Sequence, residues 1–282
     1  MITCNLVGGL GNQLFMIFNT ISCSIESNNQ FNFLNLKLLK SGNATIRHTY
    51  WESFLIELKQ FLINDIPKTI IHINEKCFKY NSLPYKNMKN KNCMVNGYFQ
   101  SYKYFEKNYK KICELINLDK IKRNLLLKLN LDTNYFDNSV SIHFRIGDYK
   151  KLLQFHPILT EKYYINAINL IKSKTEKPLK FFYFCEENDL LEVMEIIKIL
   201  ENKFPNNKFI RLGDKLKDWE QMLLMSLCKN NIIANSTFSW WGAYFNSNIN
   251  KIVCYPSVWF GPKLINHNTN DLFPTDWMKI NF

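Results

Sequence analysis

The sequence predicts an α/β protein with parallel sheets. Short apolar runs alternate with helix-like segments along most of the 282 residues, the pattern of strands joined by crossover helices. An Asn- and Asp-rich stretch at residues 130–138 interrupts this alternation, so we predict two units, residues 1–135 and 136–282. The least ordinary motifs fall where predicted strands end, which is the edge at which parallel sheets bind ligands. A cleft between the two units is therefore the expected ligand site.

The first unit opens on a predicted buried strand, residues 2–7, followed by a glycine turn and a helix from residue 12 onward. Leu14, Phe18 and Ile21 recur along that helix at the spacing of a core-facing stripe. Further strands are expected at 31–36 and 94–99, and mainly helical segments at 50–63 and 101–129.

The second unit opens on an alternating, strand-like run at residues 139–144. Thr160 is a suitable N-cap for the helix that follows, with Glu161 in its first turn. Later strands are expected at 179–185, 208–212, 231–234 and 251–255, and helices at 160–173, 190–200, 219–229 and through Tyr244.

Composition excludes several classes of protein. The net charge of +12 invites a nucleic-acid partner, but Lys supplies 32 of the 36 basic residues beside 37 Asn, a bias that A+T-rich codons explain. We therefore expect no nucleic-acid partner. No run approaches the roughly 20 apolar residues of a membrane span, and the N-terminus reads as a strand rather than a signal peptide. The eight cysteines stand singly, so we expect a soluble protein of the reducing cytoplasm.

A glycine loop, Gly8-Gly9-Leu10-Gly11-Asn12-Gln13, follows the first strand. Its glycines let a ligand approach the backbone closely, and Asn12 and Gln13 would present amides at the helix start. The spacing matches neither the dinucleotide fingerprint nor the Walker loop. A simple strand-to-helix turn explains the same residues equally well.

The segment from His143 to Tyr149 holds Arg145, one of only four arginines in the chain. A guanidinium binds phosphate through a planar fork that Lys cannot replace. At about 4 Å and an effective dielectric near 20, such a contact is worth roughly 4 kcal/mol. If this stabilisation acts only on a departing phosphate, it accelerates the reaction about a thousandfold. The alternative is a surface pair with Asp148, worth about 0–1 kcal/mol.

An acidic cluster, Glu186-Glu187-Asn188-Asp189, ends the apolar strand at 181–185. Its carboxylates can accept hydrogen bonds from a base or ribose, bind a metal, or simply favour a helix N-terminus. No Asp-x-Asp motif occurs in the chain, so we expect no metal.

A hydroxyl-rich turn, Asn235-Ser236-Thr237-Phe238-Ser239, lies between a predicted strand and a predicted helix. That arrangement offers unpaired backbone N–H groups to an anion, and the hydroxyls suit a diphosphate or ribose. Trp240 and Trp241 follow directly. They either stack on a sugar or base, or pack in the core.

Together these motifs resemble those of the α-1,2-fucosyltransferase family, which transfers fucose from GDP-fucose with inversion and without a metal. The family's G-G-L-G-N-Q-L-F opening is matched at residues 8–15, and its H-x-R-R-G-D-Y at 143–149 except at one position. A long block of the family is matched nearly throughout at residues 224–243.

The resemblance implies a GT-B-like fold of two Rossmann-like domains. The second would hold GDP-fucose and the first would form the acceptor side for a glycan, with no further cofactor. Arg145 would contact the β-phosphate, and His143 would lie near the nucleotide. The expected catalytic residues are Arg145, Asp148, His143 and Asn12. The expected donor-binding residues are Gly8, Gly9, Gly11, Glu186, Glu187, Asn235, Ser236, Thr237, Phe238 and Ser239.

Three departures from the family pattern leave the donor open. Ile146 replaces the second Arg, Cys185-Glu186-Glu187 replaces S-D-D, and Gln221 replaces an Asp. The alternatives are a different nucleotide sugar and an inactive nucleotide-sugar binder.

The general base is also open. It must reach the acceptor hydroxyl at about 2.6–3.2 Å or through one water. Asp148, His143 and His156 are the candidates, and the sequence does not choose among them.

Overall fold

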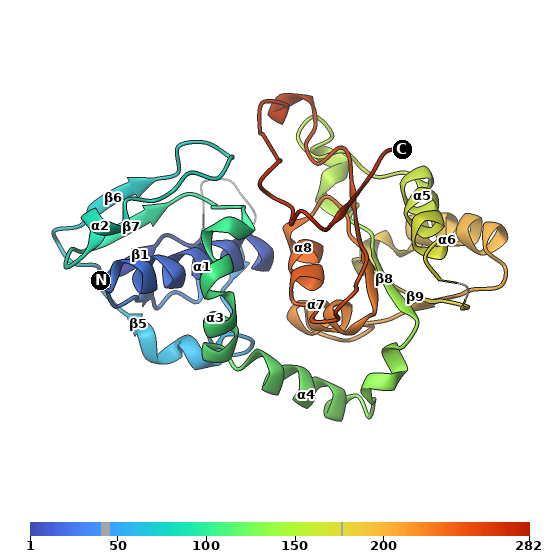
Figure 1. Cartoon of the computed structure of the whole chain (residues 1–282), viewed down its shortest axis with the longest axis horizontal. Helices are drawn as coiled ribbons and strands as arrows, with labels where there is room; N and C mark the ends of the chain where they lie inside the picture. Colours follow the sequence, from blue (N-terminus) through green and yellow to red (C-terminus); the bar gives the residue numbers. More distant parts are fainter. Residues whose placement is uncertain (41–45, 176) are drawn as a thin grey trace. The chain divides into compact units, whose positions relative to one another are not determined.

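In a computed structural model, which describes residues 1–40, 46–175 and 177–282, the chain forms two compact α/β units (Figure 1). The first comprises residues 1–124 and 267–274, and the second 125–266 and 275–282. The boundary thus falls inside helix α4 (Leu118–Lys128), upstream of the predicted linker. The predicted linker stretch instead forms a short 3-10 turn, Thr133–Phe136, whose Phe136 is buried.

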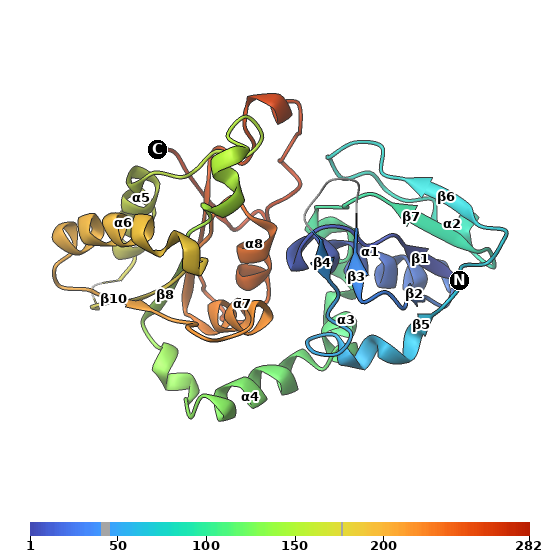
Figure 2. The same ribbon diagram turned by 180° about the vertical axis from the view of Figure 1, so that it is seen from behind.

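The first unit is built on a three-stranded parallel sheet in the order β1-β7-β6. Its strands are β1 (Ile2–Cys4), β7 (Cys93–Asn96) and β6 (Ile71–Asn74). Smaller pairs are formed by β2 (Phe33–Leu34) with β5 (Leu62–Ile63), and by β3 (Leu38–Leu39) with β4 (Arg47–His48), which Figure 2 shows from behind. The helices are α1 (Leu10–Ser27), α2 (Tyr85–Met88) and α3 (Tyr109–Leu115).

Helix α1 begins two residues earlier than predicted, so Gly11 lies within it. Most of its residues are buried, far more than the single stripe expected from the sequence. The segment predicted as helical at 50–63 holds a 3-10 helix, Ile56–Phe61, and ends in β5.

The second unit is built on a six-stranded, wholly parallel sheet in the order β10-β9-β8-β11-β12-β13. The strands are β8 (Ser139–His143), β9 (Lys180–Phe184), β10 (Lys208–Arg211), β11 (Asn230–Ile232), β12 (Val253–Pro256) and β13 (Met278–Ile280). Numbered by appearance within the unit, the order is 3-2-1-4-5-6, that of the dinucleotide-binding α/β fold. The predicted α/β, GT-B-like fold class is confirmed by a parallel sheet in each unit.

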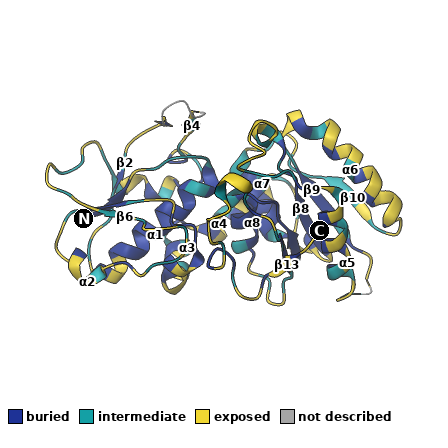
Figure 3. Ribbon diagram, turned by 90° about the horizontal axis from the view of Figure 1, so that it is seen from above, coloured by how far each residue is buried: buried dark blue, intermediate teal, exposed yellow. Residues whose placement is uncertain are grey.

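Four helices cover the two faces of this sheet. Helices α5 (Glu161–Lys172) and α6 (Leu190–Lys203) lie on one side, and α7 (Asp218–Leu227) and α8 (Thr237–Tyr244) on the other (Figures 1 and 2). The central strands β8, β9 and β11 are buried on both faces (Figure 3). This sandwich gives the runs of continuous apolar residues expected of a buried parallel sheet.

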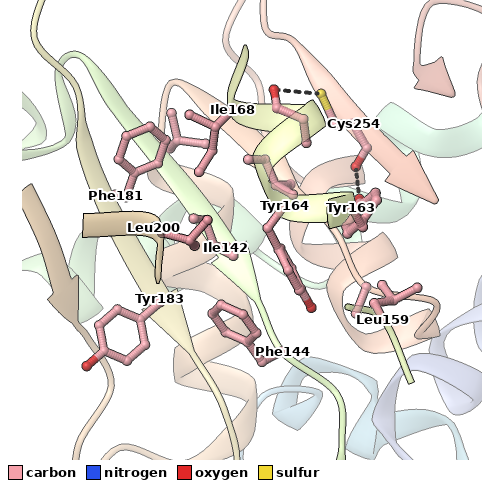
Figure 4. Packing of buried hydrophobic residues seen from close by; sticks show 14 of the residues in the cluster. Ile142, Phe144, Leu159, Tyr163, Tyr164, Ile168, Phe181, Tyr183, Leu200 and Cys254 are labelled. Atoms are coloured by element: carbon pink, nitrogen blue, oxygen red, sulfur yellow. Dashed lines mark hydrogen bonds between the residues drawn. The ribbon is translucent and has the colours of Figure 1, made fainter. Parts of the chain in front are cut away.

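A hydrophobic core packs between α5 and the sheet (Figure 4). Ile142, Phe181 and Ile168 are fully buried there. The Tyr163 hydroxyl donates to the carbonyl oxygens of Ile233 at 2.6 Å and Cys254 at 3.1 Å. Helix α5 is thereby hydrogen-bonded to the backbone of β12 and of the residue that directly follows β11.

Candidate functional site

The strand order of the second unit reverses between β8 and β11, which are hydrogen-bonded neighbours. Chain leaving β8 runs to α5, and chain leaving β11 runs to α8, on the opposite face of the sheet. Such a reversal opens a crevice at the carboxyl edge, where α/β sheets bind ligands. The arginine segment 143–149 leaves β8 and the hydroxyl-rich turn 235–239 leaves β11, so both predicted motifs lie at this point.

A direct hydrogen bond joins the two motifs. The Tyr149 hydroxyl donates to the Asn235 carbonyl oxygen at 3.0 Å. Its burial raises the pKa of Tyr149 to about 12, so the hydroxyl keeps its proton. The Tyr149 ring also lies under the Arg145 guanidinium, 5.1 Å from ring centroid to Cζ. One side chain therefore ties the arginine segment to the hydroxyl-rich turn.

Two carboxylates hold the Arg145 guanidinium. Asp148, three residues on, and Glu186, which follows β9, both form ion pairs with it. The Arg145 side chain is 17% exposed, whereas those of Asp148 and Glu186 are 43% and 53% exposed. The ion pair with Asp148, which the sequence offered as an alternative to phosphate binding, is therefore present. The guanidinium in this pair is largely buried. An entering anion would exchange with these two exposed carboxylates.

The acidic cluster is divided in its contacts. Glu187 pairs with Arg211 and not with Arg145. Arg211 also contacts Asp214 at 3.0 Å. Asp189 is buried, and its Oδ2 accepts a hydrogen bond from the Gly147 backbone N–H at 2.7 Å. Sequence reasoning missed Asp189 as a residue that positions the arginine segment. The signal available was a carboxylate beside a helix start.

A side chain at position 147 would be strained and would displace the Glu186 carboxylate. The φ of Gly147 is +24°, and a Cβ there would lie 2.9 Å from Glu186 Oε2. The left-handed region of φ favours glycine. Gly147 therefore lets the backbone approach the carboxylate that pairs with Arg145.

His143 is buried at the end of β8. Burial, with a smaller contribution from the positive charge of Arg145, lowers its pKa to about 3. Its ring lies 5.5 Å from that of Phe238, between centroids, and its Nδ1 has no hydrogen-bond partner among the described residues. A neutral imidazole of this kind can exchange hydrogen bonds with a ligand but is a poor proton acceptor.

His156 is half-buried and stacked on Tyr149, with ring centroids 4.7 Å apart. Burial lowers its pKa, and the charge of Asp148 opposes that shift. Asp148 is the only carboxylate among the three candidate bases, and its side chain is 43% exposed.

The hydroxyl-rich turn forms the N-terminus of α8. Ser236 is the N-cap, and its Oγ accepts from the Phe238 N–H at 3.3 Å. The Ser239 hydroxyl donates to the Ser236 carbonyl oxygen at 3.3 Å, within the protein. Thr237 and Phe238 are half-buried. The turn therefore presents Thr237 and Phe238 at the surface and uses Ser239 internally.

Asn235 is buried and fixes the turn from below. Its Nδ2 donates to the carbonyl oxygens of Pro157 at 2.9 Å and Trp259 at 3.3 Å. Its Oδ1 is buried without a partner among the described residues. A buried polar atom left unpaired is costly, so Asn235 Oδ1 is an acceptor that a hydrogen-bond donor would stabilise.

Trp240 and Trp241 are core residues. Both are fully buried. Trp240 stacks on Tyr244, with ring centroids 4.6 Å apart, and packs against Trp277 at 5.5 Å. Of the two alternatives drawn from the sequence, stacking on a ligand is wrong and core packing is correct.

The glycine loop belongs to the first unit. Gly8 has φ +78°, and a Cβ there would lie 2.7 Å from Asn12 Nδ2. Gly9 is the N-cap of α1 and Gly11 is buried in its first turn. Gln13, expected to present its amide, is fully buried and donates to the carbonyl oxygens of Gly8 and His48, each at 3.0 Å. That expectation is wrong, because Gln13 supports the loop from inside.

The first unit also contains a cavity of about 250 Å³ beside this loop. It is lined by residues that follow β1 and residues around β2 and β3, namely Cys4, Asn5, Leu6, Val7, Leu34, Leu36, Leu38, Leu39 and Lys40. Leu36 and Leu38 are exposed at 45% and 54%. The cavity is therefore open at its rim, and its leucines share the lining with the polar residues Asn5 and Lys40.

Two absences concern the described parts of the chain alone. Within them, no group of three or more His, Cys, Asp or Glu side chains is placed to hold a metal ion. No helix among residues 1–40, 46–175 and 177–282 combines the length and apolar character needed to cross a membrane.

Comparison with known proteins places the chain in a family. The chain is 30% identical to an α-1,2-colitosyltransferase of Escherichia coli, over 99% of both proteins. It is 28% identical to the O-antigen biosynthesis glycosyltransferase WbnK of the same species, over 99% of this chain and 100% of the relative. Among solved structures, FUT1 of Arabidopsis thaliana in complex with GDP aligns with a TM-score of 0.48 and 12% identity, covering 89% of this chain and 69% of that one. The family model described as glycosyl transferase family 11 matches residues 4–281, so the chain belongs to that family.

Proposed function

We propose that this family 11 glycosyltransferase moves fucose from GDP-fucose to a hydroxyl of a glycan acceptor without using a metal ion. The preferred acceptor atom is O2 of galactose or of a related sugar. The observation that carries the proposal is the hydrogen bond from Tyr149 to Asn235, which joins the arginine segment to the hydroxyl-rich turn at the reversal of the sheet.

The second unit supplies the donor site in this proposal. Arg145 exchanges its contacts with Glu186 and Asp148 for the diphosphate oxygens. A planar fork and a charged partner make such bonds stronger than neutral ones. The N-terminus of α8, with Ser236, Thr237 and Phe238, receives the phosphate or ribose, while Ser239 holds the turn from inside. Glu186 is thereby released from Arg145, whereas Glu187 stays paired with Arg211.

The transfer is a single displacement. An acceptor hydroxyl oxygen attacks the anomeric carbon, and the bond from that carbon to the β-phosphate oxygen breaks with its electron pair going to the phosphate. Arg145 stabilises the charge that develops there. Asp148 takes the acceptor proton, because the low pKa of His143 makes that imidazole a weak base. Gly8, Gly9, Gly11 and Asn12 line the side on which the sugar reacts.

A second donor is favoured by one comparison. The relative from Escherichia coli that is 30% identical carries the name α-1,2-colitosyltransferase. Colitose is fucose without its 3-hydroxyl, so the two sugars differ by one hydrogen-bonding group. A site that bonds this hydroxyl rejects the deoxy sugar strongly, whereas an apolar site discriminates only weakly. Parallel assays with GDP-fucose and GDP-colitose separate the two donors.

Calorimetric titration of GDP and GDP-fucose, with EDTA present, tests the proposal. We expect binding by the wild type and its loss in Arg145→Ala. Arg123→Ala is the matched control, because Arg123 is exposed on α4 and should leave binding unchanged. Absence of GDP binding by the wild type would refute the donor. Binding of GDP-fucose without transfer to any acceptor in a glycan panel would identify an inactive binder instead.

A further inference from the structure

A line of polar contacts runs along the carboxyl edge of the first sheet. Glu75 follows β6, the turn at residues 97–100 follows β7, and Asn12 follows β1. These three strands are adjacent in the order β6-β7-β1. The residues are therefore brought together by the sheet, although 88 positions separate Gln100 from Asn12.

Glu75 holds the turn in the middle of this line. Its Oε2 accepts a hydrogen bond from the Tyr98 N–H at 2.8 Å. Burial raises the pKa of this carboxyl, and bonds from the Phe99 and Tyr98 backbones oppose the shift. Gly97 has φ +146°, and a Cβ there would lie 2.4 Å from Glu75 Cβ. The close approach of the carboxylate thus requires glycine and fixes the course of the turn.

The turn delivers Gln100 to the glycine loop. Gln100 is 7% exposed, and its Nε2 donates to Asn12 Oδ1 at 3.1 Å. A side-chain amide has one accepting end and one donating end. Because Gln100 holds the Asn12 oxygen, the Asn12 Nδ2 lies on the side of Gly8. A Cβ at position 8 would lie 2.7 Å from that nitrogen.

We propose that Gln100 is a positioning residue, which fixes the Asn12 amide so that Asn12 offers an N–H donor, and not its carbonyl oxygen, to an oxygen atom of the sugar substrate. This inference rests on the proposed function, because it takes the glycine loop as part of the sugar site. In this inference the amide of Asn12 has one fixed orientation. Gln100, together with the turn that Glu75 holds, maintains that orientation.

The direction of the bond is testable without any substrate. An Asp at position 12 still accepts from Gln100, so Asn12→Asp should leave the unfolding midpoint nearly unchanged. A Glu at position 100 cannot donate, so Gln100→Glu should lower the midpoint by several degrees, as loss of one buried bond does. The double variant brings two carboxylates together and should be the least stable. If instead Gln100→Glu is tolerated and Asn12→Asp is not, the bond runs the other way and the proposal is overturned.

Catalysis provides the second test. Asn12→Asp retains the fold but removes the donor, so kcat should fall about 10- to 100-fold, the value of one to two hydrogen bonds lost in the transition state. Gln100→Leu should lower kcat by a smaller factor with little change in the KM for donor. Asn92→Asp is the matched control. Asn92 also accepts a hydrogen bond through Oδ1, from the N-terminal amine at 3.4 Å, and precedes β7 at its opposite end.

The two tests separate this inference from the function on which it rests. If the wild type transfers no sugar, the proposed function fails, while the stability comparison still decides whether Gln100 holds Asn12. If the wild type is active and Asn12→Asp retains full kcat, the assigned donor role is wrong. A fall of kcat in Asn12→Asp, with an unchanged unfolding midpoint and an unaffected Asn92→Asp, supports it.

Discussion

The carboxyl edges of the two parallel sheets differ in their chemistry. In the second unit the edge is ionic, with Arg145 held between Asp148 and Glu186. In the first unit the corresponding edge combines amides and glycines with the carboxylate of Glu75, which is bonded to backbone, and Asn12, Gln100 and Gln13 are bonded to one another or to backbone. An ionic edge suits a diphosphate, whereas neutral amides suit sugar hydroxyls. Under the proposed function, the two edges divide charge recognition from hydroxyl recognition.

The largest expected effect comes from replacing the planar cation of the ionic edge. Arg145→Lys keeps the charge but loses the fork, and Arg145→Ala loses both. We expect kcat/KM for the donor to fall roughly 100-fold or more in the lysine variant and further in the alanine variant. Steady-state kinetics at saturating acceptor provide the measurement. Equal activity of Arg145→Lys and wild type would show that simple charge suffices at this edge.

Glycine substitutions compare the two loops directly. Gly147→Ala forces a side chain onto Glu186 at a positive φ, and we expect about 1–3 kcal/mol lower free energy of unfolding. Gly9→Ala is the control in the other unit, because its φ is −76° and a Cβ there meets nothing within 4 Å. Urea unfolding monitored by fluorescence measures both. A destabilised Gly9→Ala with an unaffected Gly147→Ala would reverse our reading of which loop is tightly packed.

The buried imidazole gives the ionic edge a pH dependence. The pKa of His143 is lowered to about 3 in the folded chain, against about 6.5 when unfolded. Between these values the unfolded chain binds the proton and the folded chain does not, so stability falls as pH decreases below 6.5. The slope for one such group approaches 1.4 kcal/mol per pH unit.

We therefore expect the free energy of unfolding of the wild type to drop by about 1–2 kcal/mol more than that of His143→Gln between pH 7 and pH 5. Denaturant titrations at the two pH values supply the comparison. Parallel losses in the two proteins would mean that His143 does not contribute to the acid sensitivity.

The smallest effect concerns the competition for Arg145. Glu186→Gln removes one of the carboxylates that a diphosphate must displace. Because the Glu186 side chain is 53% exposed, its ion pair is screened and worth at most about 1 kcal/mol. GDP should therefore bind up to about fivefold more tightly by calorimetry. Glu187→Gln, which alters a carboxylate paired with Arg211, serves as the control. Weaker GDP binding by Glu186→Gln would mean that this carboxylate contacts the nucleotide itself.

Local pattern was enough to locate the motifs of both edges but not their partners. Apolar runs ending at His143 and near Ala234 placed the arginine segment and the hydroxyl-rich turn at strand ends. The pair between Arg145 and Glu186 requires that β8 and β9 be neighbours, and strand order is not written in local sequence. Likewise, Gln13 looked available because its partner His48 lies 35 residues away. Strand β13 was missed because it is three residues long and carries an exposed lysine.

The short segment at residues 267–274 limits how this protein can be recombined. It belongs to the first unit although the chain around it belongs to the second. Asp271 contributes two contacts there, its carbonyl oxygen accepting from the Ser101 hydroxyl at 2.5 Å and its carboxylate pairing with Lys103. Ser101 directly follows Gln100, so the segment supports the turn that reaches the glycine loop. A chimera that exchanges the first unit between family members must therefore transplant two pieces of chain, residues 1–124 together with 267–274, since a single crossover would leave that turn with a foreign support.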